Sequence, residues 1–272
     1  MNPYFNFLGR EVPAFGIMVL LGVAVGSFVI YLNCKINRVK LSDPMLTACM
    51  AFVGVVIGSR LLKPLINIPD IIINWEKYAQ VPLGEFLHWF FGETVFYGGL
   101  LGGFAAAYIF CRYFKIPFLP TADILAPAIP VGHALGRIGC LLGGCCYGIE
   151  VNSSHPFAVV YPERTDGFAE FTAPSGIPLL PIQVIEAIGN LGIAAILILF
   201  TFLCKKKITG QCIALYGLLY GIQRFMLEFF RGDLVRGIYG GISTSQIISI
   251  GIIIGSSAIF IFGRIKNKEI KS

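Results

Sequence analysis

Charged residues are scarce in this chain of 272 residues, at 13% of the total, while hydrophobic residues make up 56%. Soluble domains carry about 25% charged residues, so the composition excludes an ordinary soluble domain. Histidine is also rare, with three residues, and no two of the eight cysteines form a C-x2-C pair. The sequence therefore does not indicate a zinc site of the usual spacing. No internal repeat is apparent either, which argues against a transporter built from inverted repeats.

Long apolar stretches recur along the chain, each close to the roughly 20 residues that a spanning helix needs. They predict an all-α polytopic membrane protein with about seven transmembrane helices, forming one helical domain over residues 1–272. The predicted spans are 14–33, 44–64, 90–112, 122–146, 181–204, 210–230 and 241–264.

The distribution of lysine and arginine predicts the orientation of these spans. Basic residues gather in alternate connections and in the C-terminal tail, as seen in 35–40, 112–115, 205–207 and 264–271. With this basic side in the cytoplasm, the N-terminus lies outside and the C-terminus inside. Segment 149–180 is then an extracytoplasmic loop or small head segment between the fourth and fifth helices. The net charge of +6 reflects this topology and attraction to anionic lipid, and we expect no nucleic-acid partner.

Arg137 stands within an apolar run rich in glycine, VGHALGRIGCLLGGCCYG. A guanidinium is not deprotonated in a protein, and placing one at the centre of a spanning helix costs about 2.5–3.5 kcal/mol on insertion scales. Such a charge faces the protein interior and meets an anion. Arg60 and Arg224 have comparable surroundings. We therefore expect several buried cations around one polar site, with a phospholipid head group as the natural anion.

A second polar pattern lies in LYGIQRFMLEFFRGD, where Tyr220, Arg224, Glu228 and Arg231 follow at steps of four, four and three. This spacing predicts that the four side chains share one helix face. The alternative to a functional site is a charge ladder packed inside the bundle.

Other polar residues in the spans have plain structural interpretations. The carboxylates of Asp123 and Glu186 could simply neutralise the arginines, and His133 could be a packing residue with satisfied hydrogen bonds. In ETVFYGGLLGG, Glu93 and Tyr97 precede glycines at a spacing that lets helices approach closely or admits an acyl chain.

Three cysteines, Cys140, Cys145 and Cys146, follow Arg137 closely. Adjacent cysteines rarely bind one metal ion, and no pair of histidines is near enough to complete a site. We expect a structural role for these thiols and no metal site, with a redox or metal role as the open alternative.

In this order, the motifs resemble those of the prolipoprotein diacylglyceryl transferases over nearly the whole chain. GRIG and RFxxEFFR are the specific parts. The resemblance rests on AFGIMVLLGV, GSRL, FYGGLLGG, ADILAPAIPVGHALGRIGCLLGGCCYG, LPIQVIEA, GLLYGIQRFMLEFFRGD and GISTSQIISI.

The resemblance implies transfer of a diacylglyceryl group from phosphatidylglycerol to the lipobox cysteine thiol of a prolipoprotein. It implies a multi-pass protein of the bacterial cytoplasmic membrane whose active site faces the outer leaflet, with glycerol phosphate released and no cofactor. The chemistry of the residues agrees with this reaction, since arginines can hold a phosphate bidentately and stabilise the leaving group.

On the family pattern, Arg137 matches the signature arginine that contacts the lipid phosphate, and Arg224 matches a second essential arginine. The implied catalytic residues are Arg137, Arg224 and Tyr97. The implied substrate-binding residues are Arg137, Arg60, Tyr220, Gly98, Gly99 and Glu228.

The chain also departs from the family pattern. Tyr97 stands where the family usually has histidine, and a phenol is a poorer base at neutral pH. Cys140, Gly143 and Cys145 replace Asn, Asn and Glu. Further replacements are Leu180 for histidine and Phe15 for tyrosine. The alternatives are therefore a divergent paralogue with another acceptor, or a non-catalytic phospholipid-binding membrane protein or transporter.

Overall fold

The computed structural model describes residues 4–7, 9–86, 95–163, 173–204, 209–233 and 238–269, and these are mostly helical. The chain forms two compact units, each described here by itself. Unit 1 comprises residues 1–39 and 122–272, and unit 2 comprises residues 40–121.

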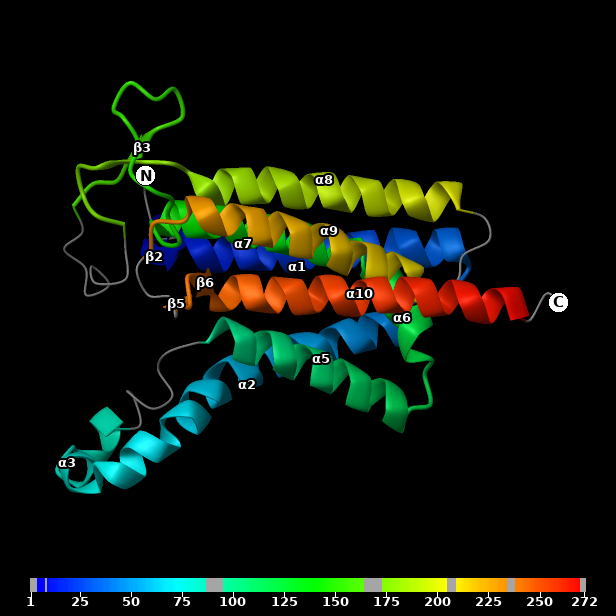
Figure 1. Ribbon diagram of the computed structural model, residues 1–272, viewed down its shortest axis with the longest axis horizontal. Helices are drawn as coiled ribbons and strands as arrows, with labels where there is room; N and C mark the ends of the chain where they lie inside the picture. The colour runs from blue at the N-terminus through cyan, green and yellow to red at the C-terminus, as the bar shows by residue number, and fades with distance from the viewer. Residues whose placement is uncertain are drawn as a thin grey trace. The chain divides into compact units, whose positions relative to one another are not determined.

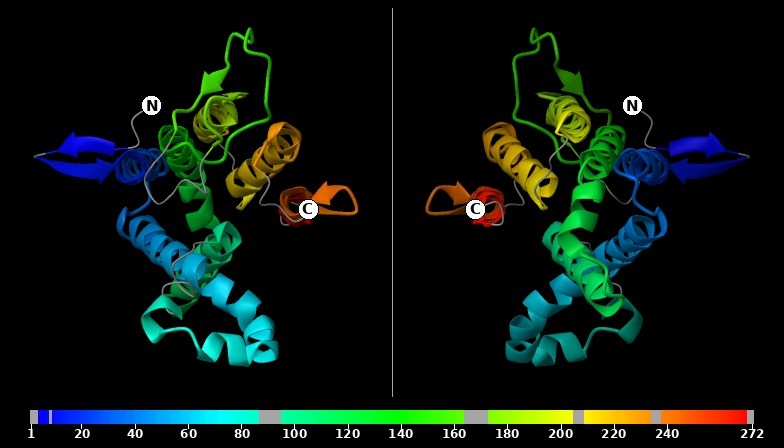
Figure 2. Two further views of the ribbon diagram at one scale, coloured as in Figure 1. Left: turned by 90° about the vertical axis from the view of Figure 1, so that its left-hand side faces the viewer. Right: turned by 90° about the vertical axis from the view of Figure 1, so that its right-hand side faces the viewer.

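In the described part of unit 1, five long helices lie side by side (Figure 1). They pack in the order α1, α7, α8, α9 and α10, each against the next. The bounds are α1 Ala14–Asn37, α7 Ala128–Gly143, α8 Ile182–Leu203, α9 Gln211–Leu227 and α10 Thr244–Glu269. The end-on views in Figure 2 show these helices running roughly parallel to one axis.

Short strands gather at one end of this bundle, which we call the head end (Figure 1). Each strand pairs antiparallel with its partner, and β1 and β2 place Tyr4 opposite Pro13. The pairs are β1 Tyr4–Phe7 with β2 Arg10–Pro13, β3 Val159–Val160 with β4 Pro178–Leu179, and β5 Ile238–Tyr239 with β6 Ile242–Ser243. Helices α1, α8 and α10 begin at the head end, and α7 and α9 finish there.

Unit 2 is built on two helices, α2 Ser42–Ile73 and α5 Phe96–Tyr113, with the short helix α3 Trp75–Ala79 after α2. Glycines let their backbones meet. A Cβ added at Gly98 would collide with the carbonyl oxygen of Gly58, and one at Gly102 would collide with that of Gly54. This close approach through small residues is typical of helix pairs in membranes.

Helix α6, Phe118–Leu125, is separated from α7 by a break and bent from it by 46°. Pro127 lies at this break and Pro130 in the first turn of α7. Proline lacks an N–H donor and its ring clashes with the preceding turn, so one predicted span becomes two helices.

Each predicted span overlaps a described helix, but fewer than seven of these helices have the length and apolarity of a membrane span. Among the described residues, four helices are long and apolar enough to cross a membrane, and the bent pair α6–α7 would make a fifth. The four are Ala14–Asn37, Ser42–Ile73, Ile182–Leu203 and Thr244–Ile261. The fold is therefore that of a helical membrane protein with four or five candidate spans.

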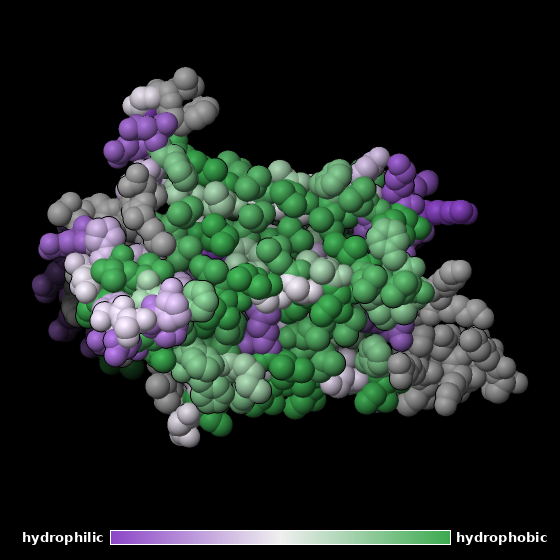
Figure 3. Space-filling view, turned by 90° about the horizontal axis from the view of Figure 1, so that it is seen from above, coloured by the Kyte–Doolittle hydropathy of each residue, from purple (hydrophilic) through white to green (hydrophobic). Residues whose placement is uncertain are grey.

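Large apolar side chains cover the outside of these helices. Leu20 in α1 is 72% exposed, Ile188 in α8 is 66% exposed and Ile254 in α10 is 64% exposed. Figure 3 shows this hydrophobic covering over α8 and its neighbours in unit 1. Such a surface is unfavourable in water and suits a lipid environment.

Segment 149–180 crosses the head end of unit 1. It holds the β3–β4 pair and a small core around Tyr161, Ala173 and Leu179, all nearly inaccessible to solvent. Its start is tied to the turn that follows α9, because Ile149 N–H donates to the Phe230 carbonyl at 3.0 Å.

Candidate active site

Arg137 and Glu186 form a buried ion pair between α7 and α8. Arg137 Nη2 lies 3.0 Å from Glu186 Oε1, and the two side chains are 10% and 1% exposed. His133, one turn before Arg137 on α7, places Nε2 at 3.6 Å from the same carboxylate oxygen. The sequence-based expectation that Glu186 neutralises an arginine is thus confirmed.

Arg224 forms a second buried ion pair at the end of α9. Its Nη2 lies 3.0 Å from Glu228 Oε2 and donates a hydrogen bond to Ser245 Oγ at 3.1 Å. Glu228 begins the short 3₁₀ helix η2, Glu228–Phe230, and Ser245 is the second residue of α10. Arg224 therefore links α9 to α10.

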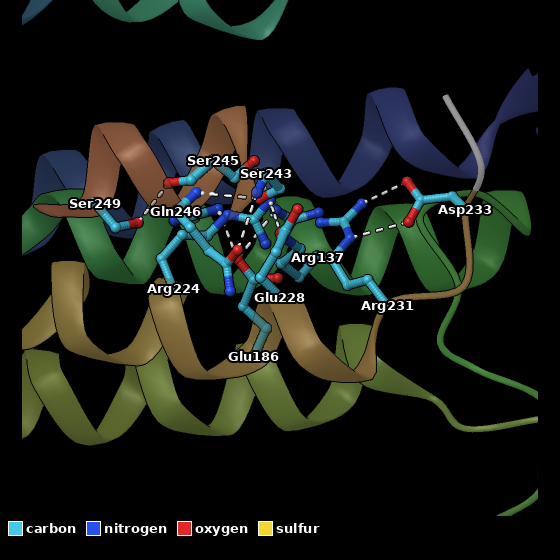
Figure 4. Close-up of polar contacts among 11 residues, drawn as sticks. Arg137, Glu186, Arg224, Glu228, Arg231, Asp233, Ser243, Ser245, Gln246 and Ser249 are labelled. Atoms are coloured by element: carbon cyan, nitrogen blue, oxygen red, sulfur yellow. Dashed lines mark hydrogen bonds and ion pairs between the residues drawn. The ribbon is translucent and has the colours of Figure 1, made fainter. Parts of the chain in front are cut away.

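His133 and Tyr220 lie beside each other near the Arg137–Glu186 pair. Their ring centroids are 5.3 Å apart, and Tyr220 stacks on Tyr216 at 5.7 Å. His133 interacts electrostatically with both Arg137 and Arg224. Figure 4 shows the side chains of Arg137, Glu186, Arg224 and Glu228 gathered in one region between the helices.

Both guanidinium groups keep a buried donor without a hydrogen bond. Arg137 Nε and Arg224 Nη1 have no hydrogen-bond partner among the described residues. A guanidinium offers five N–H donors in a planar fork, and buried donors of this kind ordinarily find an acceptor. The two arginines can therefore accommodate a further anion.

The cluster lies close to the head end of the bundle. Arg224 is three residues before the end of α9, Glu186 is the fifth residue of α8, and Arg137 is six residues before the end of α7. At a rise of about 1.5 Å per residue, all three Cα atoms lie within about 10 Å of the helix ends.

The prediction that Arg231 shares the helix face of Tyr220, Arg224 and Glu228 is wrong. Helix α9 ends at Leu227, and Arg231 has extended backbone angles of −88° and 137°. Its guanidinium instead makes two hydrogen bonds to Asp233, at 3.1 and 2.8 Å. Burial raises the pKa of the Asp233 carboxyl above its usual value, and the Arg231 guanidinium opposes this effect.

Four other predicted site residues lie in unit 2. Arg60 is exposed near the middle of α2, and Tyr97 is half-buried in the first turn of α5. Gly98 and Gly99 pack against α2, where a Cβ at Gly99 would lie 3.3 Å from Val55. The catalytic role of Tyr97 and the substrate-binding roles of the other three stay predictions. Glu93 lies outside the described residues.

Asp123 has a different role from the one expected. Its carboxylate accepts hydrogen bonds from the Gly210 N–H at 2.6 Å and the Ile213 N–H at 2.9 Å. It thereby caps the start of α9, where free N–H groups and the helix dipole favour a negative charge.

Sequence reasoning also missed contacts that only the folded chain shows. Ser245 falls within the stretch GISTSQIISI, yet its bond to Arg224 has no signal in the sequence. Gln183 likewise donates to the Cys145 carbonyl at 2.7 Å and to the Tyr161 hydroxyl at 3.2 Å, tying α8 to the head segment.

Cys140, Cys145 and Cys146 lie together beyond Arg137. Their sulfur atoms are all within 4.8 Å of one another, and the three thiols are free and partly buried. Among the described residues, no other group of three or more His, Cys, Asp or Glu side chains could hold a metal ion.

Comparison with known proteins finds full-length relatives. Residues 3–262 match the family described as prolipoprotein diacylglyceryl transferase. The phosphatidylglycerol–prolipoprotein diacylglyceryl transferase 2 of Clostridium perfringens is 31% identical over 265 residues, covering 97% of this chain and 96% of that protein. A similarly named protein of Clostridium tetani is 30% identical over 259 residues, covering 95% of each chain. One of Rickettsia conorii is 31% identical over 268 residues, covering 93% of each.

Proposed function

Because the chain belongs to the prolipoprotein diacylglyceryl transferase family, we propose that Arg137 and Arg224 hold the phosphate of its donor lipid. The enzyme is a transferase that moves the diacylglyceryl group of phosphatidylglycerol to a prolipoprotein. The position and burial of the two arginines support this role. Two buried guanidinium groups lie at the same end of unit 1, and each keeps a donor without a partner among the described residues.

The chemistry requires one bond to form and one to break. The sulfur of the acceptor cysteine, as a thiolate, attacks the glyceryl carbon that carries the phosphate, so a C–S bond forms. The C–O bond to the phosphate breaks, and glycerol phosphate leaves with the electron pair. The thiol proton passes to a base or to water. Arginines that hold the phosphate through charge-assisted hydrogen bonds stabilise the negative charge that develops on the leaving oxygen.

Further parts of the proposal concern the neighbouring side chains. Tyr220 lies beside His133 and near the two ion pairs, which supports a role in orienting the bound head group. Glu228 holds Arg224 in place through their 3.0 Å contact. The roles of Arg60 in steering the head group and of Gly98 and Gly99 in binding substrate rest on the family pattern. Tyr97, at the position where the family usually has histidine, is proposed as a catalytic residue that orients groups near the scissile bond.

The proposed topology has seven spans, an outer N-terminus and a cytoplasmic C-terminus in a bacterial cell membrane. Lys35 and Arg38 lie at the end of α1 opposite the head end, which is the arrangement expected if the head end faces outward. The arginines would then lie at the level of the outer leaflet, where the lipobox of a secreted prolipoprotein emerges.

The test is a transfer reaction with purified protein in detergent. Phosphatidylglycerol and a lipobox peptide are supplied, and mass spectrometry is used to find a diacylglyceryl thioether on the peptide cysteine. We expect the adduct from the wild-type chain and its loss in Arg137→Ala. Arg112→Ala, an exposed arginine at the end of α5, serves as the control and should keep activity.

Two outcomes would contradict the proposal. Normal turnover by Arg137→Ala would remove the central role of that arginine. Binding of phosphatidylglycerol without an adduct on the peptide would point to another acceptor or to a lipid-binding protein.

A further inference from the structure

The thiols of Cys140, Cys145 and Cys146 converge at the end of α7. Each contributes one sulfur, and all three sulfurs lie within 4.8 Å of one another. The three side chains are partly buried, and none is joined in a disulfide. The proposed transfer chemistry uses none of these thiols, so it does not explain why they lie together.

The backbone turn after α7 produces this convergence. Gly144 ends the helix with a left-handed φ of 71°, and Cys145 N–H donates to the Cys140 carbonyl at 3.0 Å. Cys146 also has a positive φ, 57°, which a residue with a side chain rarely adopts. This sequence of two left-handed residues folds Cys145 and Cys146 back toward Cys140.

Contacts on both sides of the turn hold it in place. The Cys145 carbonyl accepts a hydrogen bond from Gln183 Nε2 at 2.7 Å. The Gly232 N–H donates to the Tyr147 carbonyl at 3.1 Å, next to the bridge between Gly148 and Arg231. The thiols are therefore presented by a fixed backbone.

We propose that Cys140, Cys145 and Cys146 bind one soft metal ion of the d¹⁰ class, Cu(I) or Zn(II), through their three sulfurs. Thiolates select such ions over hard cations. At a metal–sulfur distance of about 2.3 Å, the sulfurs of a trigonal site are about 4.0 Å apart. That spacing is within the 4.8 Å limit observed for these three sulfurs. On binding, three S–H bonds are exchanged for three metal–sulfur bonds and up to three protons pass to solvent.

The charge of the surroundings fits this complex. Three thiolates carry a charge of minus three, so the complex stays anionic with either ion. Arg137 and Arg231 both interact electrostatically with the Cys146 sulfur. A bound ion would connect the last turn of α7, which carries Arg137, to the segment paired with Arg231.

The test is metal binding by the full chain, purified in detergent under anaerobic, reducing conditions. The protein is titrated with Zn²⁺ alone and, in a separate sample, with Cu(I) delivered from a chelator. Each sample is desalted, and the metal content per chain is measured by inductively coupled plasma mass spectrometry. We expect about one tightly held ion per chain. We expect its loss in Cys145→Ser and in Cys146→Ser, and its retention in Cys49→Ser, which removes an exposed thiol on α2.

A second measurement guards against a variant that fails to fold. The wild-type chain is alkylated with and without metal, and modified cysteines are identified by peptide mass. Protection of the three thiols by metal supports the site. Equal alkylation with and without metal would overturn the proposed site. Equal metal content in Cys145→Ser and the wild type would also overturn it, and so would a disulfide among these residues in the reduced preparation. Because neither measurement uses lipid transfer, their outcome is independent of the proposed function.

Discussion

Ser245 offers a sharp test of how Arg224 is positioned. Its hydroxyl accepts a hydrogen bond from Arg224 Nη2 at 3.1 Å, and this bond joins the guanidinium to α10. A hydrogen bond to a charged group contributes about 1.5–3 kcal/mol. Ser245→Ala leaves Arg224 its second partner, Glu228, whose Oε2 lies 3.0 Å from Nη2 in this structure, so we expect the lower end of this range.

We therefore expect Ser245→Ala to lower kcat/KM for diacylglyceryl transfer by about tenfold, since about 1.4 kcal/mol corresponds to a factor of ten. Ser245→Thr, which keeps a hydroxyl, should restore most of the activity. The assay is the initial rate of thioether formation on a lipobox peptide at several concentrations of phosphatidylglycerol.

Ser249, one turn further along α10, provides the matched control. It is buried, with 1% of its surface exposed, and its hydroxyl donates a hydrogen bond to the Ser245 backbone carbonyl at 2.8 Å. Ser249→Ala removes the same group from the same helix without removing the hydroxyl that contacts Arg224. If both alanine variants had equal kcat/KM, the argument that Ser245 positions Arg224 would be refuted.

Three other substitutions test separate parts of the structure. Tyr97→Phe should lower kcat with the fold unchanged, and full activity would make Tyr97 a packing residue. Gly98→Ala should destabilise the α2–α5 pair by about 1–3 kcal/mol, because the added Cβ would collide with the Gly58 carbonyl. Thermal unfolding in detergent measures this loss. The control is Gly16→Ala, whose added Cβ has no atom within 4 Å. Asp123→Ala should cost about 1–2 kcal/mol through loss of the α9 cap, and an unchanged unfolding temperature would contradict that assignment.

The sequence locates the helices well because long apolar stretches are a direct consequence of a lipid environment. The helix ends are predicted less well. Helix α2 continues to Ile73, past the predicted end at 64, with Pro64 and Pro69 inside it. Conversely, Pro127 divides what the apolar pattern presents as one span.

The site shows the same division between local and long-range information. A buried arginine in an apolar run, such as Arg137, is recognisable because its charge is costly there. Its partner Glu186 could be inferred only as one of two carboxylates, and the other, Asp123, caps a helix instead. The position of Arg231 depended on where α9 ends, since side-chain spacing carries meaning only while the helix continues.

The two buried carboxylates, Glu186 and Glu228, have a consequence for the catalytic cycle. Each already holds one of the arginines at 3.0 Å. If the lipid phosphate binds there as proposed, it shares the guanidinium groups with two carboxylates of the chain itself. After transfer, the glycerol phosphate product would compete for the arginines with the same two carboxylates, which are always at high local concentration. Under the proposed function, the two ion pairs would therefore shorten the time that product stays bound, and they would leave the site neutral before the next lipid enters.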